Sequence, residues 1–420
     1  MTWSHPLSRW WIAAVLFAAG LVPTGGSAAE VKAANTPALT GEQIANWLAK
    51  GDERKRLVAL EAVHWNSRHD AAFTEALQTV IDQSATLRGP TASQFRAVQV
   101  LAGSPLPAAD TWLVRLLSSS DWRMQMTAAD ALGERGSEVA VPALLACWNS
   151  RVAVENYGLR HAIVCALGEL KGTSGLDALI RILPQLEGQL RYEAIARLTL
   201  RTGEKFGDRT EEWIAWQKSR DPNWSGPRVD QQPPPREVAW NATLPRFFRV
   251  PIYAKRVLFV VDMSGSMKST VEGKTRLEAT QDQLTNVIEA LPEDSLFGVI
   301  AFNDRVQPWA IQPKLATSDN KASAIQAVWS LSAQGGTAVN DALEVALGYN
   351  GYLEQILLLT DGRPTAGRLV DTAPIVSNIT GRNQFRRVRI DTIGLDTTGE
   401  AERLLQQLSE HNHGQYNKLR

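Results

Sequence analysis

The spacing of hydrophobic residues changes near residue 250. From about residue 41 to 218, apolar residues recur every three or four positions, which is the spacing of helices that bury one face. From about residue 249 onward, short continuous apolar runs alternate with segments of helical period. Such runs predict buried strands, and their alternation with helices predicts a mostly parallel sheet covered on both faces. The sequence therefore predicts an all-α region followed by a doubly wound, Rossmann-like α/β domain.

The helical half contains an internal repeat. The tetrapeptide Ala-Leu-Gly-Glu occurs at Ala131–Glu134 and again at Ala166–Glu169, an offset of 35 residues. A period of this length indicates stacked helix pairs that bury their faces against one another. The pattern resembles HEAT-type repeats, most clearly over residues 128–145 and 163–183 and less clearly over 56–81 and 95–117. The resemblance implies a surface for a second protein partner, and an irregular helical bundle is the alternative.

The second half has a series of expected elements. The strands are expected at Val257–Val261, Leu296–Phe302, Val306–Ile311, Gln355–Thr360, Val388–Ile393 and Gly414–Lys418. The helices are expected at Arg276–Leu291, Asn320–Leu331, Val339–Leu347 and Ala401–Leu408. Ligands of such sheets bind beyond the carboxyl ends of the strands. Ligand-binding side chains are therefore expected at those ends.

Polar side chains gather where two expected strands end and where a Gly-Gly-Thr loop opens a helix. Two of these residues are aspartates and three carry hydroxyls: Asp262, Ser264, Ser266, Thr337 and Asp361. Carboxylate and hydroxyl oxygens are the ligands that hard divalent cations prefer. The set predicts a Mg²⁺ site with waters completing the shell, and Mn²⁺ or Ca²⁺ are alternatives. Asp341, one helical turn after Thr337, is a weaker candidate that would support the ligands or stabilise the start of its own helix.

Three segments, residues 260–267, 335–337 and 359–362, closely resemble in order the metal-ion-dependent adhesion site of the von Willebrand factor type A (vWA) domain. The resemblance spans roughly residues 249–420. It implies that Ser264, Ser266 and Thr337 contact the metal directly, while Asp262 and Asp361 act mostly through water. It also implies a vacant coordination position for a Glu or Asp of a protein partner, hence a binding protein and not an enzyme.

Two other functions remain open at this point. A metal-dependent, phosphatase-like hydrolase could use Asp262 as its nucleophile, although such enzymes usually place a second acid two residues later, where this chain has Ser264. A scaffold could instead keep the metal for a purely structural purpose. Each alternative predicts a different response to chelation.

The remaining features concern location and partners. Residues 1–29 have the charge, short apolar core and small-residue end of a signal peptide, which predicts a periplasmic, secreted or cell-surface protein. Membrane contact is expected only if that segment stays uncleaved.

Residues 30–40 are expected to be disordered, and a proline-rich linker, 219–248, separates a 41–218 repeat domain from a 249–420 vWA domain. The 44 basic and 44 acidic residues balance, so nothing favours nucleic acid. Cys147 and Cys165 are expected to be buried free thiols, with a disulfide as the alternative.

Overall fold

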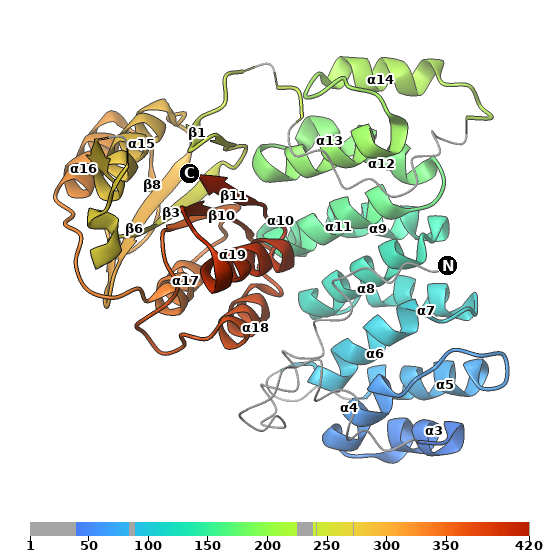
Figure 1. Ribbon diagram of the computed structural model, residues 1–420. Coiled ribbons are helices and arrows are strands. Elements are labelled where there is room, and N and C mark those ends of the chain that lie inside the picture. Colours follow the sequence, from blue (N-terminus) through green and yellow to red (C-terminus); the bar gives the residue numbers. More distant parts are fainter. Residues whose placement is uncertain (1–38, 84–88, 225–237, 241, 272, 420) are drawn as a thin grey trace. The chain divides into compact units, whose positions relative to one another are not determined.

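Figure 1 shows the computed structural model, which describes residues 39–83, 89–224, 238–240, 242–271 and 273–419. The expected signal peptide, nearly all of the segment 30–40 and the middle of the proline-rich linker lie outside the described residues. The described residues fall into two compact units. One is helical and comprises residues 39–186 and 193–239, and the other contains a large sheet and comprises residues 187–192 and 240–419. No helix among the described residues has both the length and the apolar character needed to cross a membrane.

The first half of the chain is helical, as the periodicity predicts. Its helices are α3 (Gly41–Lys50), α4 (Glu53–Glu61), α5 (Asp70–Ile81), α6 (Ala92–Ala102), α7 (Ala108–Leu116), α8 (Trp122–Arg135), α9 (Val141–Trp148), α10 (Arg151–Glu155), α11 (Tyr157–Glu169), α12 (Ser174–Ile182), α13 (Gly188–Thr202) and α14 (Thr210–Ser219). Successive repeats stack, so that α8 packs against both α6 and α11. The N-terminal helical-repeat region is therefore confirmed. Cys147 is buried and Cys165 half-buried, and both are free thiols.

The repeated glycines lie at close contacts between neighbouring repeats. A Cβ atom on Gly133 of α8 would lie 2.8 Å from the Cα of Ala166 in α11. A Cβ atom on Gly168 of α11 would lie 2.3 Å from the Cδ of Arg197 in α13. Because real side chains do not tolerate such distances, glycine allows the helices to pack at this separation. The sequence repeat therefore reflects a repeated helix contact.

Two arginines near helix ends bind carbonyl oxygens in the last turn of an earlier helix and in the turn that follows it. Arg135 closes α8 and Arg201 lies in the last turn of α13. The acceptors are the carbonyl oxygens of Ala102, Ser104 and Leu106 for Arg135, and those of Gly168, Leu170, Lys171 and Gly172 for Arg201. Carbonyls at a helix end need such donors, so each arginine stabilises the turn between the two helices of the preceding repeat.

The second half forms a seven-stranded sheet of order β11-β10-β9-β3-β6-β7, in which β8 also pairs with β6. The strands are β3 (Arg256–Asp262), β6 (Leu296–Phe302), β7 (Val306–Pro308), β8 (Lys314–Leu315), β9 (Gln355–Thr360), β10 (Arg389–Leu395) and β11 (Tyr416–Leu419). All neighbours from β11 to β6 are parallel, whereas β7 and β8 run antiparallel to β6. Two small hairpins pair β1 (Arg246–Phe247) with β2 (Val250–Pro251) and β4 (Thr270–Val271) with β5 (Lys274–Thr275). β3 lies centrally, between β9 and β6.

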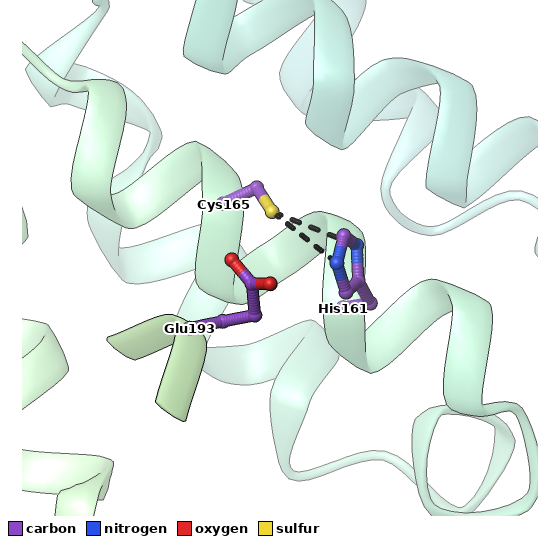
Figure 2. A group of neighbouring side chains, drawn as sticks. All are labelled: His161, Cys165 and Glu193. Carbon is purple, nitrogen blue, oxygen red and sulfur yellow. Dashed lines mark hydrogen bonds between the residues drawn. The ribbon is translucent and has the colours of Figure 1, made fainter. Parts of the chain in front are cut away.

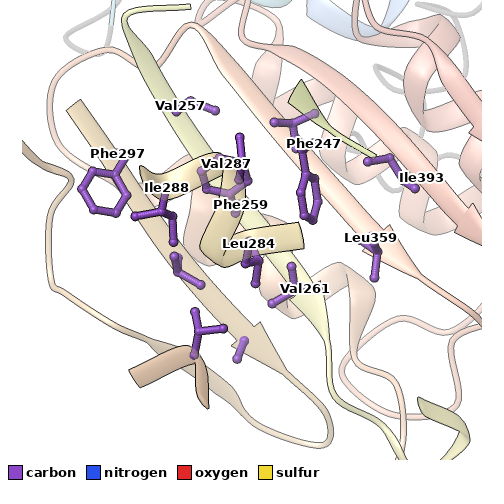
Figure 3. Packing of buried hydrophobic residues seen from close by; sticks show 14 of the residues in the cluster. Phe247, Val257, Phe259, Val261, Leu284, Val287, Ile288, Phe297, Leu359 and Ile393 are labelled. Atoms are coloured by element: carbon purple, nitrogen blue, oxygen red, sulfur yellow. The ribbon is translucent and has the colours of Figure 1, made fainter. Parts of the chain in front are cut away.

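Both faces of the sheet are buried. Along β3, Val257, Phe259 and Val261 belong to one hydrophobic core, and Leu258 and Val260 to the other. Figure 3 shows the first core, to which α15 contributes Leu284, Val287 and Ile288. The helices of this face are α15 (Arg276–Ala290) and α16 (Ser318–Trp329), and those of the opposite face are α17 (Val339–Gly348), α18 (Thr372–Asn383) and α19 (Gly399–His411). Burial on both faces explains why the parallel strands read as continuous apolar runs.

Helix α18 and strand β7 are two of the elements that differ from the expected ones. Helix α18 has no counterpart among the expected helices, because its twelve residues bury only three apolar side chains and include a proline and a glycine. The edge strand expected over Val306–Ile311 ends at Pro308, although the Trp309 N–H still donates to the Val299 carbonyl oxygen of β6 at 2.8 Å. Neither difference moves the carboxyl ends of β3 and β9.

Candidate metal centre

The central strand β3 ends in a buried acidic residue. Asp262 is the last residue of β3 and is fully buried. The chain then extends through Ser264 and enters a short 3₁₀ helix, Gly265–Lys268, that carries Ser266. This turn directs the Ser264 N–H back to Asp262 Oδ1, which accepts it at 2.7 Å. The strand end and the turn therefore hold one carboxylate and two hydroxyls together.

Hydrogen bonds connect this turn to the neighbouring strand β9. The hydroxyl oxygens of Ser264 and Ser266 lie 3.0 Å apart. Ser266 Oγ donates to Asp361 Oδ1 at 2.7 Å, and Thr360 Oγ1 donates to Asp262 Oδ2. Four of the five expected residues, all except Thr337, thus form one connected group of oxygens at the carboxyl ends of β3 and β9.

Thr337 lies in a buried loop beside this group. The Gly265 N–H donates to the Gly335 carbonyl oxygen at 3.0 Å, which joins the loop to the turn after β3. The Thr337 N–H donates to Thr365 Oγ1 at 3.0 Å, which joins it to the segment after β9. These bonds bring the third expected segment to the same edge of the sheet, with Thr337 only 4% exposed.

Asp304 orients the Gly-Gly-Thr loop and was not among the expected residues. Its Oδ1 accepts the N–H of Gly336 at 2.8 Å. A Cβ atom on Gly335 would lie 2.2 Å from Asp304 Oδ2, and Gly335 has a φ of +74°, so both features require glycine there. Asp304 follows the end of β6, a strand next to β3, so its position at a carboxyl strand end was the signal available in the sequence.

Arg276 was also missed, although it contacts one of the expected residues. It is the first residue of α15, and its Nη1 donates to Asp361 Oδ2 at 2.8 Å. Its Nη2 donates to Asp396 Oδ2 at 2.9 Å, beyond the end of β10. One cationic side chain therefore bridges two carboxylates at the sheet edge. No spacing in the sequence indicates this contact.

Asp262 is a buried carboxylate whose pKa is raised. Burial raises its pKa to about 6, against the lowering effect of the hydrogen bonds from Thr360 and Ser264. Among the ion pairs that the described residues form, none includes Asp262, whereas Asp361 has Arg276. A buried carboxylate with neutral donors only, next to two hydroxyls and a second carboxylate, is a donor set that suits a hard divalent cation.

Asp341 has a different set of partners. Its carboxylate oxygens accept the N–H of Arg368 at 3.1 and 3.2 Å, and one of them also accepts from the Asn340 side chain. A Cβ atom on Gly367 would lie 2.9 Å from Asp341 Oδ2. Asp341 therefore holds the loop that follows Asp361.

Two family models match separate parts of the chain, one in the helical half and one in the half that contains the sheet. The sequence model described as von Willebrand factor type A domain matches residues 255–418, and the model described as HEAT repeats matches residues 88–155. Human inter-alpha-trypsin inhibitor heavy chain H6 is 31% identical over 180 residues, which are 39% of this chain and 13% of that protein. Mouse inter alpha-trypsin inhibitor, heavy chain 4, is 31% identical over 129 residues, or 28% and 13% of the two chains. The matched segments are therefore only a small part of these relatives.

Solved structures of similar proteins were also found. A von Willebrand factor type A protein from Catenulispora acidiphila covers 40% of this chain, and 40% of its own, with a TM-score of 0.35 and 22% identity. Proximal thread matrix protein 1 from the mussel byssus, with a zinc occupied MIDAS motif, covers 39% of this chain and 40% of its own, with a TM-score of 0.31 and 22% identity. The family matches and the observed architecture together give the organisation of the molecule: an N-terminal helical-repeat region followed by a C-terminal von Willebrand factor type A domain.

Proposed function

We propose that this protein is an exported binding protein whose vWA domain holds a Mg²⁺ ion and uses it to capture an acidic side chain of a protein partner. The residues that would hold the ion are Asp262, Ser264, Ser266, Thr337 and Asp361. When bound, the ion supplies a positive charge with a coordination position open to a carboxylate. The helical repeats would provide a second surface for protein contact, as stacked repeats commonly do.

The observation that carries this proposal is the buried carboxylate of Asp262. It lies at the carboxyl end of the central strand, accepts hydrogen bonds from neutral donors only, and has its pKa raised to about 6 by burial. Burial of an ionised carboxylate is costly unless a cation compensates it. The adjoining Ser264, Ser266 and Asp361 oxygens supply further donors of the type that Mg²⁺ uses. The vWA match supports protein interaction as the role of this domain.

The first test measures Mg²⁺ binding by itself, without a protein partner. Isothermal titration of the purified protein with MgCl₂ should give one binding event that is absent in Asp262→Ala. Asp319→Ala removes an exposed carboxylate from α16 of the same domain and serves as the matched control. Equal Mg²⁺ binding by the wild type and Asp262→Ala, with circular dichroism unchanged, would refute the metal site.

The second test addresses the partner. Affinity capture from the native source, with Mg²⁺ or with EDTA, should retain a partner only with Mg²⁺ and only with an intact Asp262. If EDTA lowers the melting temperature while capture is unchanged, the ion is structural. If the wild type instead turns over a generic phosphoester in Mg²⁺ and Asp262→Asn does not, the protein is a hydrolase.

A further inference from the structure

A second group of potential metal ligands lies inside the helical unit, and it differs chemically from the one in the vWA domain. Helix α11 carries His161 and Cys165, and α13 carries Glu193. One ligand atom from each of the three side chains lies within 4.8 Å of the others. In Figure 2 the three side chains converge on one point between the helices. We propose that His161, Cys165 and Glu193 form a binding site for Zn²⁺ or a cation of similar softness.

Two of the three proposed ligands lie on the same face of α11. Residues four apart on a helix lie on the same face one turn apart, so His161 and Cys165 point in the same direction. Cys165 Sγ lies 3.5 Å from His161 Nδ1 and 3.9 Å from Nε2. In a tetrahedral zinc site the metal lies about 2.3 Å from sulfur and about 2.0 Å from nitrogen, which places those two atoms roughly 3.5 Å apart. The thiol and imidazole are therefore already spaced as zinc ligands.

Glu193 completes a set of three protein ligands. A thiolate, an imidazole and a carboxylate match zinc better than magnesium, because sulfur and nitrogen are softer donors than oxygen. A tetrahedral shell then keeps a fourth position for water, as zinc sites with three protein ligands do. The oxygen set of the vWA domain has the opposite preference. The two sites should therefore respond to different cations.

The surrounding charges are compatible with a bound cation. Arg197 Nη1 donates to Glu193 Oε2 at 2.7 Å, and its Nη2 donates to Cys165 Sγ at 2.9 Å. Glu169 lies 3.9 Å from the same guanidinium. With the thiolate formed, three negative charges on Cys165, Glu193 and Glu169 would balance Zn²⁺ and Arg197. The hydrogen bonds from Arg197 would also orient two of the ligands from outside the shell.

Zn²⁺ would replace the thiol proton of Cys165 on binding. The Cys165 S–H bond breaks, a sulfur–zinc bond forms, and the proton leaves to the buffer. No oxidant or reductant takes part. Binding should therefore consume one Zn²⁺ per chain and release about one proton.

Cobalt is the probe for this site, because Co²⁺ bound to a thiolate gives a charge-transfer absorption band that oxygen ligands do not give. The full-length reduced protein should show this band with one equivalent of Co²⁺, and Zn²⁺ should displace it. Asp262→Ala should keep the band, which separates this site from the vWA site and makes the two proposals fail independently. Cys165→Ser should lose it. Cys147→Ser, which alters the other free cysteine, should keep it.

Glu193→Gln tests the third ligand while preserving the side-chain shape. We expect its Zn²⁺ affinity to fall at least about tenfold, measured by competition with a chelating dye. If Cys165→Ser does not fold, iodoacetamide labelling of Cys165 in the wild type replaces it, and Zn²⁺ should slow that labelling. A wild-type protein without a thiolate band at saturating Co²⁺, a band that persists in Cys165→Ser, or labelling that Zn²⁺ leaves unchanged would overturn the proposal.

Discussion

Arg276 donates to Asp361 across 2.8 Å, and this pair places a positive charge directly beside the proposed metal centre. The Asp361 carboxylate is fully buried in the pair, and the arginine is only 18% exposed. The same guanidinium also binds Asp396. It therefore neutralises part of the charge that would attract a cation, and it ties the end of β9 to the start of α15.

Removing this charge should strengthen cation binding. In Arg276→Gln, a neutral amide replaces the guanidinium and can still donate to Asp361, so we expect Mg²⁺ affinity to rise by up to about tenfold, or about 1.4 kcal/mol. Arg276→Lys keeps the charge and should stay close to the wild type. Isothermal titration measures both. Weaker binding by Arg276→Gln would mean that the orientation of Asp361 matters more than the charge.

Burial of Asp262 predicts a pH-dependent stability in the metal-free protein. The pKa of this group rises from 3.8 to about 6 on folding, so the folded state holds the proton more tightly than the unfolded chain. Stability from this group is therefore present at low pH and is lost as the pH rises through about 6. In EDTA, Asp262→Asn should be more stable than the wild type near pH 8, by at most about 3 kcal/mol, and the difference should vanish near pH 4.

Urea unfolding over this pH range measures the effect. Addition of Mg²⁺ near pH 8 should stabilise the wild type and leave Asp262→Asn nearly unchanged, because only the wild type would bind the ion. A difference between the two proteins that is the same at every pH would contradict the assignment to Asp262.

The repeated glycine contact in the helical region predicts a steric effect. Gly133→Ala places a methyl group 2.8 Å from the Ala166 Cα, and we expect it to destabilise the helical region by about 1–3 kcal/mol. Gly381→Ala is the control, since nothing lies within 4 Å of a Cβ atom at that position in α18. It should be neutral or stabilising by up to about 1 kcal/mol. Thermal unfolding followed by calorimetry distinguishes the two, and equal effects would contradict the close contact.

Arg135, at the end of α8, should stabilise the folded protein through its hydrogen bonds to carbonyl oxygens. Arg135 pairs with Asp110 at 2.6 Å, is 10% exposed and binds three carbonyl oxygens. Arg135→Ala leaves these groups without a charged donor and should cost about 2–3 kcal/mol in chemical denaturation. Arg151→Ala removes an exposed arginine paired with Glu155 and should leave the midpoint unchanged. A midpoint that Arg135→Ala also leaves unchanged would refute this role.

Much of the α/β domain could be predicted from the sequence because its parallel strands are buried on both faces. The bounds of β6 and β9 match the expected segments, and β3 differs by one residue at each end. The positions of Asp262 and Asp361 followed from these bounds, since polar residues directly after parallel strands share one sheet edge. The family match and the architecture bear out the α/β fold, while cation binding stays a prediction.

The residues that were missed act across long separations in the sequence. Arg276 reaches Asp361 over 85 positions and Asp304 reaches Gly336 over 32, and no local pattern encodes either contact. His161 and Cys165 are visible as a pair spaced by four, but Glu193 joins them only because α13 packs beside α11. Helix α18 was missed for a different reason, because too few of its residues are apolar.

The carbonyl contacts of Arg135 and Arg201 also bear on the order in which the protein matures during synthesis. Each arginine lies about thirty residues after the helix end that it stabilises. A newly made repeat therefore leaves the ribosome with the carbonyl groups of the turn between its two helices still facing water, and these groups are bound only when the first helix of the next repeat has been translated. We expect the helical region to consolidate one repeat behind the growing chain.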